Sequence, residues 1–169
     1  MTAVDRRAVA VAGHTGDVAT ATAGLKNADP AVRATALGAL QRLGVLTDAH
    51  LTKALVDPSP TVRRRAAEVS ATHVDVNLTD VLRDDDQTVV EMAAWACGEH
   101  ESNDDMIVDL LISLASTADD ALVREAAVAA LGAIGFDGSD VEAAIDRALT
   151  DRDWQVRQAA EDLRRAQNL

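Results

Sequence analysis

The chain has 169 residues, the size of one globular domain or of a short repeat array whose units share a continuous core. Its 28 acidic residues outnumber 16 basic ones and give a formal net charge of −12 at pH 7. A surface of this sign repels nucleic acid and anionic lipid, so we expect no nucleic acid and no membrane among the partners. Aromatic residues make up 2% of the sequence, which disfavours β-sandwiches and favours an all-α protein.

Cysteine usage and hydropathy bear on the compartment. Cys97 is the single cysteine, so the chain cannot form an intrachain disulfide and suits a reducing environment. The apolar run near the N-terminus is too short for a membrane span, which needs roughly 18 or more apolar residues. We therefore expect a cytoplasmic protein.

A short phrase, Val-Arg-x-x-Ala, returns along the chain with successive valines 27 to 34 residues apart. A period of this length indicates a repeat architecture. The third and the N-terminal copies have lost the arginine. The phrase begins at Val4, Val32, Val62, Val89, Val123 and Val156.

In chain order, the pattern predicts a leading helix over about 3–12, the second half of a unit within 1–14. Five helix pairs follow, at about 17–44, 47–73, 75–100, 104–135 and 138–167. In the other four pairs a leucine lies seven residues before the valine, at Leu25, Leu55, Leu82 and Leu149. In the fourth pair Leu114 lies nine residues before Val123, so the frame slips by two residues and we expect an insertion near residues 116–118. All 169 residues are assigned to one domain.

Each pair is expected to contain a first helix, a short polar turn and a second helix. In the second helices, apolar residues recur at a period near 3.6, as on one helical face. Asp29-Pro30 and Ser59-Pro60 are typical of helix starts, where the cap accepts backbone N–H groups and proline fits the first turn. Gly44 and Gly135 are typical of helix ends.

These residues resemble the HEAT repeat, and the near-30-residue period is similar to its short subtype found in phycobilisome bilin lyases. The resemblance implies a right-handed α-solenoid, or superhelix, whose second helices line the concave surface. An aspartate recurs five residues before the valine, at Asp57, Asp84 and Asp151. The resemblance also implies that this Asp and the Arg of the phrase are structural, forming a ladder in which each Arg reaches an Asp of its own or the next unit. HEAT repeats serve scaffolds, adaptors, assembly factors and a few enzymes, so function is expected where the units differ.

Residues two, three, six and ten places after each valine are expected to face the groove. In the third unit these include Trp95, a large aromatic on a surface of small residues, with Met92 one turn before it. Such anchors ringed by charges are typical of protein-binding sites, although Trp95 could equally lie in the core. We expect Trp154 to cap the end of the core. The candidate partner-binding residues are Arg64, Arg65, Glu68, Glu91, Met92, Trp95 and Glu99.

The histidines of the sequence do not predict a metal site. His73 and His100 share one register in consecutive units, with Cys97 and several carboxylates nearby in the sequence, but packed histidines at helix ends explain them better. The dipeptide His100-Glu101 resembles an iron-ligand pair of deoxyhypusine hydroxylase, a HEAT-type di-iron enzyme that needs several such pairs. This chain has one, so we expect no metal and no cofactor.

Other catalytic patterns fail as well. Cys97 is expected mid-helix as a small buried hydrophobe without a base. The run Asp84-Asp85-Asp86 lacks the glycine and spaced ligands of a calcium loop and is read as a helix cap. The run Arg63-Arg64-Arg65 is outweighed by nearby acids, so it does not indicate a nucleic-acid cleft.

The sequence therefore predicts a non-catalytic scaffold, adaptor or assembly factor, not an enzyme, which binds a protein or peptide segment of possibly basic character on the second-helix face. The alternative is a bilin-lyase-like subunit, or one associated with cofactor attachment or a metalloenzyme. We expect a monomer, since the polar face of the last helix, from Trp154 to Leu169, disfavours self-association through that end.

Overall fold

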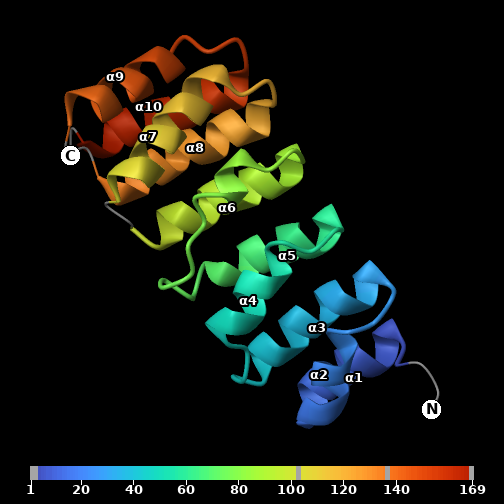
Figure 1. Ribbon diagram of the computed structural model, residues 1–169. Helices are drawn as coiled ribbons and strands as arrows, with labels where there is room; N and C mark the ends of the chain where they lie inside the picture. Colours follow the sequence, from blue (N-terminus) through green and yellow to red (C-terminus); the bar gives the residue numbers. More distant parts are fainter. Residues whose placement is uncertain (1–3, 102–103, 136–137, 168–169) are drawn as a thin grey trace. The chain divides into compact units, whose positions relative to one another are not determined.

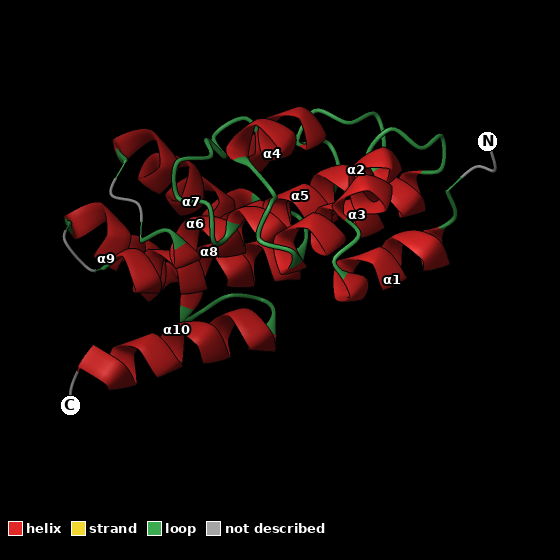
Figure 2. Ribbon diagram, turned by 90° about the horizontal axis from the view of Figure 1, so that it is seen from below, coloured by secondary structure: helices red, strands yellow, loops and turns green. Residues whose placement is uncertain are grey.

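The computed structural model describes residues 4–101, 104–135 and 138–167. Within these ranges the secondary structure is entirely helical, with ten α-helices and one short 3₁₀ helix joined by brief loops (Figures 1 and 2). The expected all-α class is confirmed. The chain divides into two compact units, unit 1 (Met1–Asn77) and unit 2 (Leu78–Leu169).

Unit 1 has two rows of helices. The second-helix row stacks α1 (Arg6–Thr15) on α3 (Pro30–Arg42) and α3 on α5 (Pro60–Ser70). The first-helix row contains α2 (Val18–Gly24), packed on α1 and α3, and α4 (Asp48–Ala54), packed on α5. The rows meet over leucines that are fully shielded from water, and this burial is the main stabilising contribution to such a fold. The most deeply buried side chains include Val9, Leu37, Leu40, Leu51 and Val62.

Unit 2 repeats this arrangement with a different start. The second helices α6 (Gln87–Glu99), α8 (Ala121–Ile134) and α10 (Trp154–Gln167) stack in order, with α7 (Asp105–Thr117) and α9 (Ser139–Ala148) packed on α8 and on each other. The first element is the 3₁₀ helix η1 (Val81–Arg83), which packs on α6. The expected α-helix in the first half of the third pair is therefore wrong. Val, Thr, Asn and Asp, which are poor helix formers, fill most of this segment.

The predicted insertion in the fourth pair lies inside a helix. Helix α7 has 13 residues and continues through Ser116 to Thr117, whereas the corresponding helices α2 and α4 have seven residues each. Leu114 thus lies within α7, whereas Leu25 and Leu55 lie at the C-caps of α2 and α4. The extra residues lengthen the first helix and leave the turn short.

Much of the acidic excess caps helices. An aspartate side chain accepts a backbone N–H bond at the start of seven helices, where it also meets the positive end of the helix dipole. Ser59, in contrast, makes no side-chain cap bond. Helix α5 therefore begins at the predicted position with Pro60 in its first turn, but without the expected side-chain cap. The predicted stop at Gly44 is confirmed by its left-handed φ of 68°. The capping residues are Asp5, Asp17, Asp29, Asp86, Asp104, Asp120 and Asp153.

Candidate functional site

The recurrent Arg and Asp form the expected structural ladder within each unit. Arg33 donates Nε and one Nη to the two carboxylate oxygens of Asp57 at 2.8 and 2.7 Å, and its other Nη donates to the carbonyls of residues 27 and 28. Arg124 does the same with Asp151, at 2.8 Å for both bonds. The Arg124 side chain is 3% exposed. These two arginines join α3 and α8 to the turn of the repeat that follows each of them, so they serve the stack and not a site.

The rung of the ladder that would start from the third repeat lacks both of its partners. Val90 stands where the third repeat would have its arginine, and Ala118 stands where the following turn would have its aspartate. A buried ion that lost its partner would retain its desolvation cost, so the two residues must change together. This paired replacement explains why the third repeat could lose its arginine and still stack.

The ladder carboxylates are held in their charged form. Hydrogen bonds from Arg124 lower the pKa of Asp151 below its ordinary value. Burial opposes this for Asp57, but bonds from Arg33 and from the Ser59 N–H outweigh it, and the pKa of Asp57 is also lowered. Each pair therefore stabilises the fold fully above the unfolded aspartate pKa of about 3.9, and this stabilisation is lost as pH falls through the lower folded pKa.

We expect the urea midpoint of the protein to fall as the pH drops below about 4, because the unfolded state then binds protons at Asp57 and Asp151 that the folded state, with its lowered pKa values, does not. The Asp151→Asn variant has one such carboxylate fewer, so its midpoint should depend less on pH. Urea titrations from pH 7 to pH 3, followed by circular dichroism, measure this. Asp85→Asn, at an exposed aspartate, should keep the wild-type pH profile; the same profile for Asp151→Asn would contradict the assignment.

The second-helix face of unit 1 contains a hollow of about 440 Å³, which we name the arginine groove. Its lining comes from α1, α3 and α5, and none of the lining residues is acidic. Arg6 donates to the Thr35 hydroxyl at 3.3 Å, whereas Arg42 and Arg64 form no ion pair with any residue that the structure describes. The lining is Arg6, Ala10, His14, Ala31, Ala34, Thr35, Gly38, Ala39, Arg42, Thr61, Arg64 and Arg65.

Two predicted site residues, Arg64 and Arg65, therefore line this groove. Arg65 is partly neutralised, since it pairs with Glu68 at 2.6 Å, and its guanidinium covers Gly38. Arg6 and Arg42 were missed. They lie two and ten residues after their repeat valines, so the same register rule applied to the first two second helices would have found them.

The other predicted site residues lie on α6 in unit 2. Trp95 is 42% exposed, which settles that it is not a core residue. Glu91 and Met92 are half-buried and Glu99 is exposed. Trp154, expected to cap the core, is 64% exposed, so that expectation is wrong: Trp154 begins α10 with its ring largely in solvent.

The side chains considered for metal binding or catalysis have structural roles. His73 lies with Nδ1 2.7 Å from Asp48 and Nε2 3.0 Å from Gln41, and His100 is the C-cap of α6. Asp84 accepts from the Asp86 N–H, which supports the capping interpretation. Within the described ranges, no group of three potential ligands could hold a metal ion. Cys97 is fully buried, and burial raises the pKa of its thiol to about 12, so it is not a nucleophile at neutral pH.

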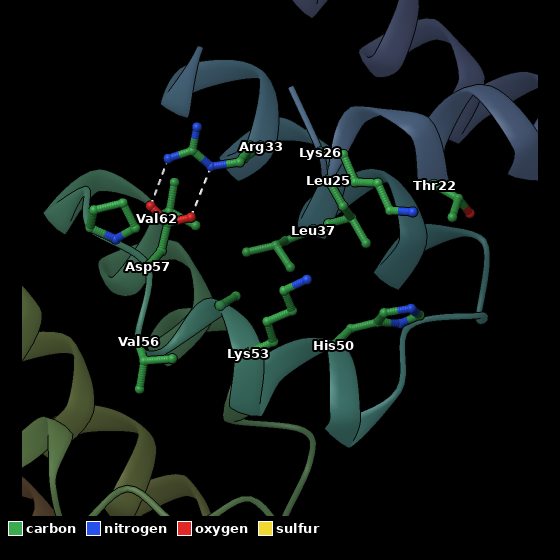
Figure 3. A pocket seen from close by; sticks show the side chains of 12 residues that line it. Thr22, Leu25, Lys26, Arg33, Leu37, His50, Lys53, Val56, Asp57 and Val62 are labelled. Atoms are coloured by element: carbon green, nitrogen blue, oxygen red, sulfur yellow. Dashed lines mark hydrogen bonds and ion pairs between the residues drawn. The ribbon is translucent and has the colours of Figure 1, made fainter. Parts of the chain in front are cut away.

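A second cavity of about 470 Å³ lies on the first-helix side of unit 1, and we name it the lysine pocket (Figure 3). Its sides are α2 and α4, and its floor includes Leu25, Leu37 and Val62. Lys26 and Lys53 extend into this space, while the Arg33–Asp57 pair bounds the opposite end. This cavity could not be predicted from the sequence, because the two lysines occupy different registers of their repeats. No helix in the described residues has the length and apolar character to cross a bilayer.

Solved structures of two engineered proteins and of a designed armadillo repeat protein share this fold. An engineered protein is 22% identical, with 93% of this chain and 81% of that chain covered and a TM-score of 0.63. A designed armadillo repeat protein in complex with the peptide (KR)4 is 19% identical, with 97% and 87% covered and a TM-score of 0.67. A second engineered protein is 22% identical, with 94% and 84% covered and a TM-score of 0.67. The fold is thus an all-helical repeat solenoid.

The sequence comparisons agree with the structural ones. No curated protein matches the chain significantly. The family model described as HEAT repeats matches residues 76–164, just over half of the chain, which include the unit with the missing ladder rung. The resemblance to the phycobilisome-lyase subtype stays a prediction. The helix pairs, their Arg–Asp ladder and this match together establish that the chain belongs to the HEAT-repeat family.

Proposed function

We propose that this protein is a non-catalytic interaction scaffold, an adaptor or assembly factor that holds a segment of a partner protein on its second-helix faces. The observation that carries the proposal is the arginine groove. A stack of helices is stable without such a hollow, and three of its arginines, Arg6, Arg42 and Arg64, are not engaged by a carboxylate of the described residues. A concave surface with free donors at fixed positions is suited to binding a peptide.

The charge of this groove selects its ligand. Guanidinium groups bind carboxylates through paired N–H donors, and these contacts are strongest where the site excludes water. The chain has a net charge of −12, so a local concentration of arginine without lining acids is an exception to its overall character. We propose that the segment held on unit 1 carries acidic residues.

The α6 face has the opposite character. Trp95 offers a large exposed apolar surface, Met92 lies one turn before it, and Glu91 and Glu99 add negative charge. Such a face is suited to an apolar side chain beside a basic residue, which is the basic partner that the sequence favours. The designed armadillo repeat protein of the same fold class is described in complex with the peptide (KR)4, which supports peptide binding by this fold.

The experiment tests the arginine groove and the α6 face separately. Capture from a lysate with the tagged full chain, followed by mass spectrometry, identifies bound proteins, and each candidate is then purified and titrated by fluorescence anisotropy. We expect Trp95→Ala with Glu91→Ala, or Arg42→Gln with Arg64→Gln, to weaken binding at least about tenfold, or about 1.4 kcal/mol. Far-ultraviolet circular dichroism should not change, because these side chains are exposed or half-buried.

Met106→Ala is the control, since it removes an exposed apolar side chain from the first helix α7, which is not part of the second-helix faces. It should leave the affinity unchanged. If the partner bound both double variants as tightly as it bound the wild type, the second-helix faces would not be the binding surface.

The alternative role in cofactor attachment has less support. Covalent attachment of a chromophore through this chain's cysteine would need an accessible thiolate, whereas Cys97 is buried with its pKa raised to about 12. Visible absorbance and elemental analysis of the purified protein test this role directly. A bound chromophore or a stoichiometric metal would favour it over the scaffold.

A further inference from the structure

The lysine pocket exists because the two short first helices of unit 1, α2 and α4, do not fill the space between successive repeats. In unit 2, the consecutive first helices α7 and α9 pack against each other, but no comparable packing joins α2 and α4. Both α2 and α4 have seven residues, about two turns, too short to fill the space between successive repeats. The result is a cavity of about 470 Å³, within the range of about 300–1,000 Å³ that is usual for small-ligand sites.

The floor of this cavity is apolar. Leu37 is fully buried, Val62 and Leu55 nearby are almost so, and Ala54 is 8% exposed. Val56, at the rim, is 78% exposed, so it leaves apolar surface in water without a partner. Because Leu37 and Val62 are already shielded, an apolar group entering the pocket would mainly cover the solvated surface of Val56 and of half-buried Leu25.

The cations of the pocket are unusual in this chain. Lys26 and Lys53 are its only two lysines, and both line the one cavity. Neither forms an ion pair with a described residue. The one carboxylate in the lining, Asp57, already accepts hydrogen bonds from Nε and one Nη of Arg33 at the far end of the pocket, as Figure 3 shows.

His50 adds a third donor on the same side. Its Nδ1 accepts from the Thr47 N–H at 3.3 Å in the capping box of α4 and lies 3.0 Å from the Thr47 hydroxyl. In the neutral imidazole the proton therefore lies on Nε2. Since Nδ1 is used by the helix cap, Nε2 is the nitrogen that remains for a ligand.

We propose that the lysine pocket binds a small amphipathic carboxylate, with the anionic head between Lys26, Lys53 and His50 and the apolar body on the floor of Leu25, Leu37 and Val62. Charge complementarity selects the head, because the available donors are cationic or neutral N–H groups. The apolar floor favours a ligand whose remaining part is a hydrocarbon chain. The site lies on the first-helix side and uses none of the residues of the arginine groove, so it is independent of the proposed scaffold function.

Octanoate, below its micelle concentration, is the probe, and ¹H–¹⁵N NMR of the full chain is the measurement. Octanoate should shift the amide signals of α2 and α4 saturably. Acetate has the carboxylate without the hydrocarbon chain, and octylammonium has the same chain with a positive charge. Neither should shift these amide signals at the same concentration. Equal shifts with octylammonium would overturn the proposed charge selection.

Lys26→Gln with Lys53→Gln should weaken octanoate binding at least tenfold. The matched control is Arg7→Gln with Arg83→Gln, which removes two exposed cations outside the pocket and changes the net charge equally. It should bind as the wild type does. Equal weakening in both double variants would mean that octanoate responds to net charge alone, which contradicts a site.

A third variant blocks the space without removing charge. Thr22 is an exposed lining residue of α2, so Thr22→Trp should fill the mouth, abolish the shifts and leave circular dichroism unchanged. Undiminished binding by Thr22→Trp would place octanoate elsewhere. Binding of an acidic, leucine-containing peptide at these signals in the absence of any octanoate response would assign the pocket to a protein segment and overturn the proposal.

Discussion

The Asp151→Ala variant is expected to lose about 3 kcal/mol of unfolding free energy, because Arg124 would remain buried without its carboxylate. The Arg124 side chain is 3% exposed, and both Nε and one Nη donate to Asp151. The other Nη donates to the carbonyls of Ala118 and Asp119, so the guanidinium cannot swing into solvent without breaking those bonds. Urea denaturation followed by circular dichroism measures the loss.

The double variant Arg124→Val with Asp151→Ala should be more stable than Asp151→Ala alone. It copies the pair Val90 and Ala118, which the chain itself uses one repeat earlier, and leaves no unpaired ion. A double-mutant cycle completed with Arg124→Val gives the coupling free energy, which we expect to exceed about 1 kcal/mol. Additive losses would mean that the ladder does not couple the repeats.

Gly98→Ala is expected to destabilise unit 2 by about 1–2 kcal/mol. A Cβ at this position in α6 would lie 2.9 Å from the Ala130 Cα of α8, a backbone atom that cannot move without shifting the helix. Overpacking of this kind costs about 1–3 kcal/mol, and alanine recovers up to about 1 kcal/mol through its higher helix propensity. Thermal unfolding measured for the variant and the wild type gives the difference.

Gly132→Ala is the control at the matching register, since both glycines lie nine residues after their repeat valine. Its new Cβ would meet the branched end of Leu163, which can turn aside, so the helix-propensity gain should leave this variant near wild-type stability. Equal losses for both variants would show that the close approach of α6 and α8 is not what requires glycine at position 98.

The sequence by itself determined the repeat frame. Starts at Asp29-Pro30 and stops at Gly44 follow from local rules about caps and positive φ, which depend on a few neighbouring residues. The Arg–Asp ladder was also predictable, because it recurs at a fixed spacing and each rung joins adjacent elements. Local chemistry repeated at one period is the information that a single sequence carries best.

Only the tertiary structure decided where the surface is hollow. The exposure of Trp95 depends on how closely its neighbours approach, which its register leaves open. The lysine pocket depends on the sparse packing between α2 and α4, and Lys26 and Lys53 line it from unrelated registers. Repeating residues specify the stack because each stabilises one local contact, whereas a cavity is the space that several helices leave unfilled together, and no single repeat encodes it.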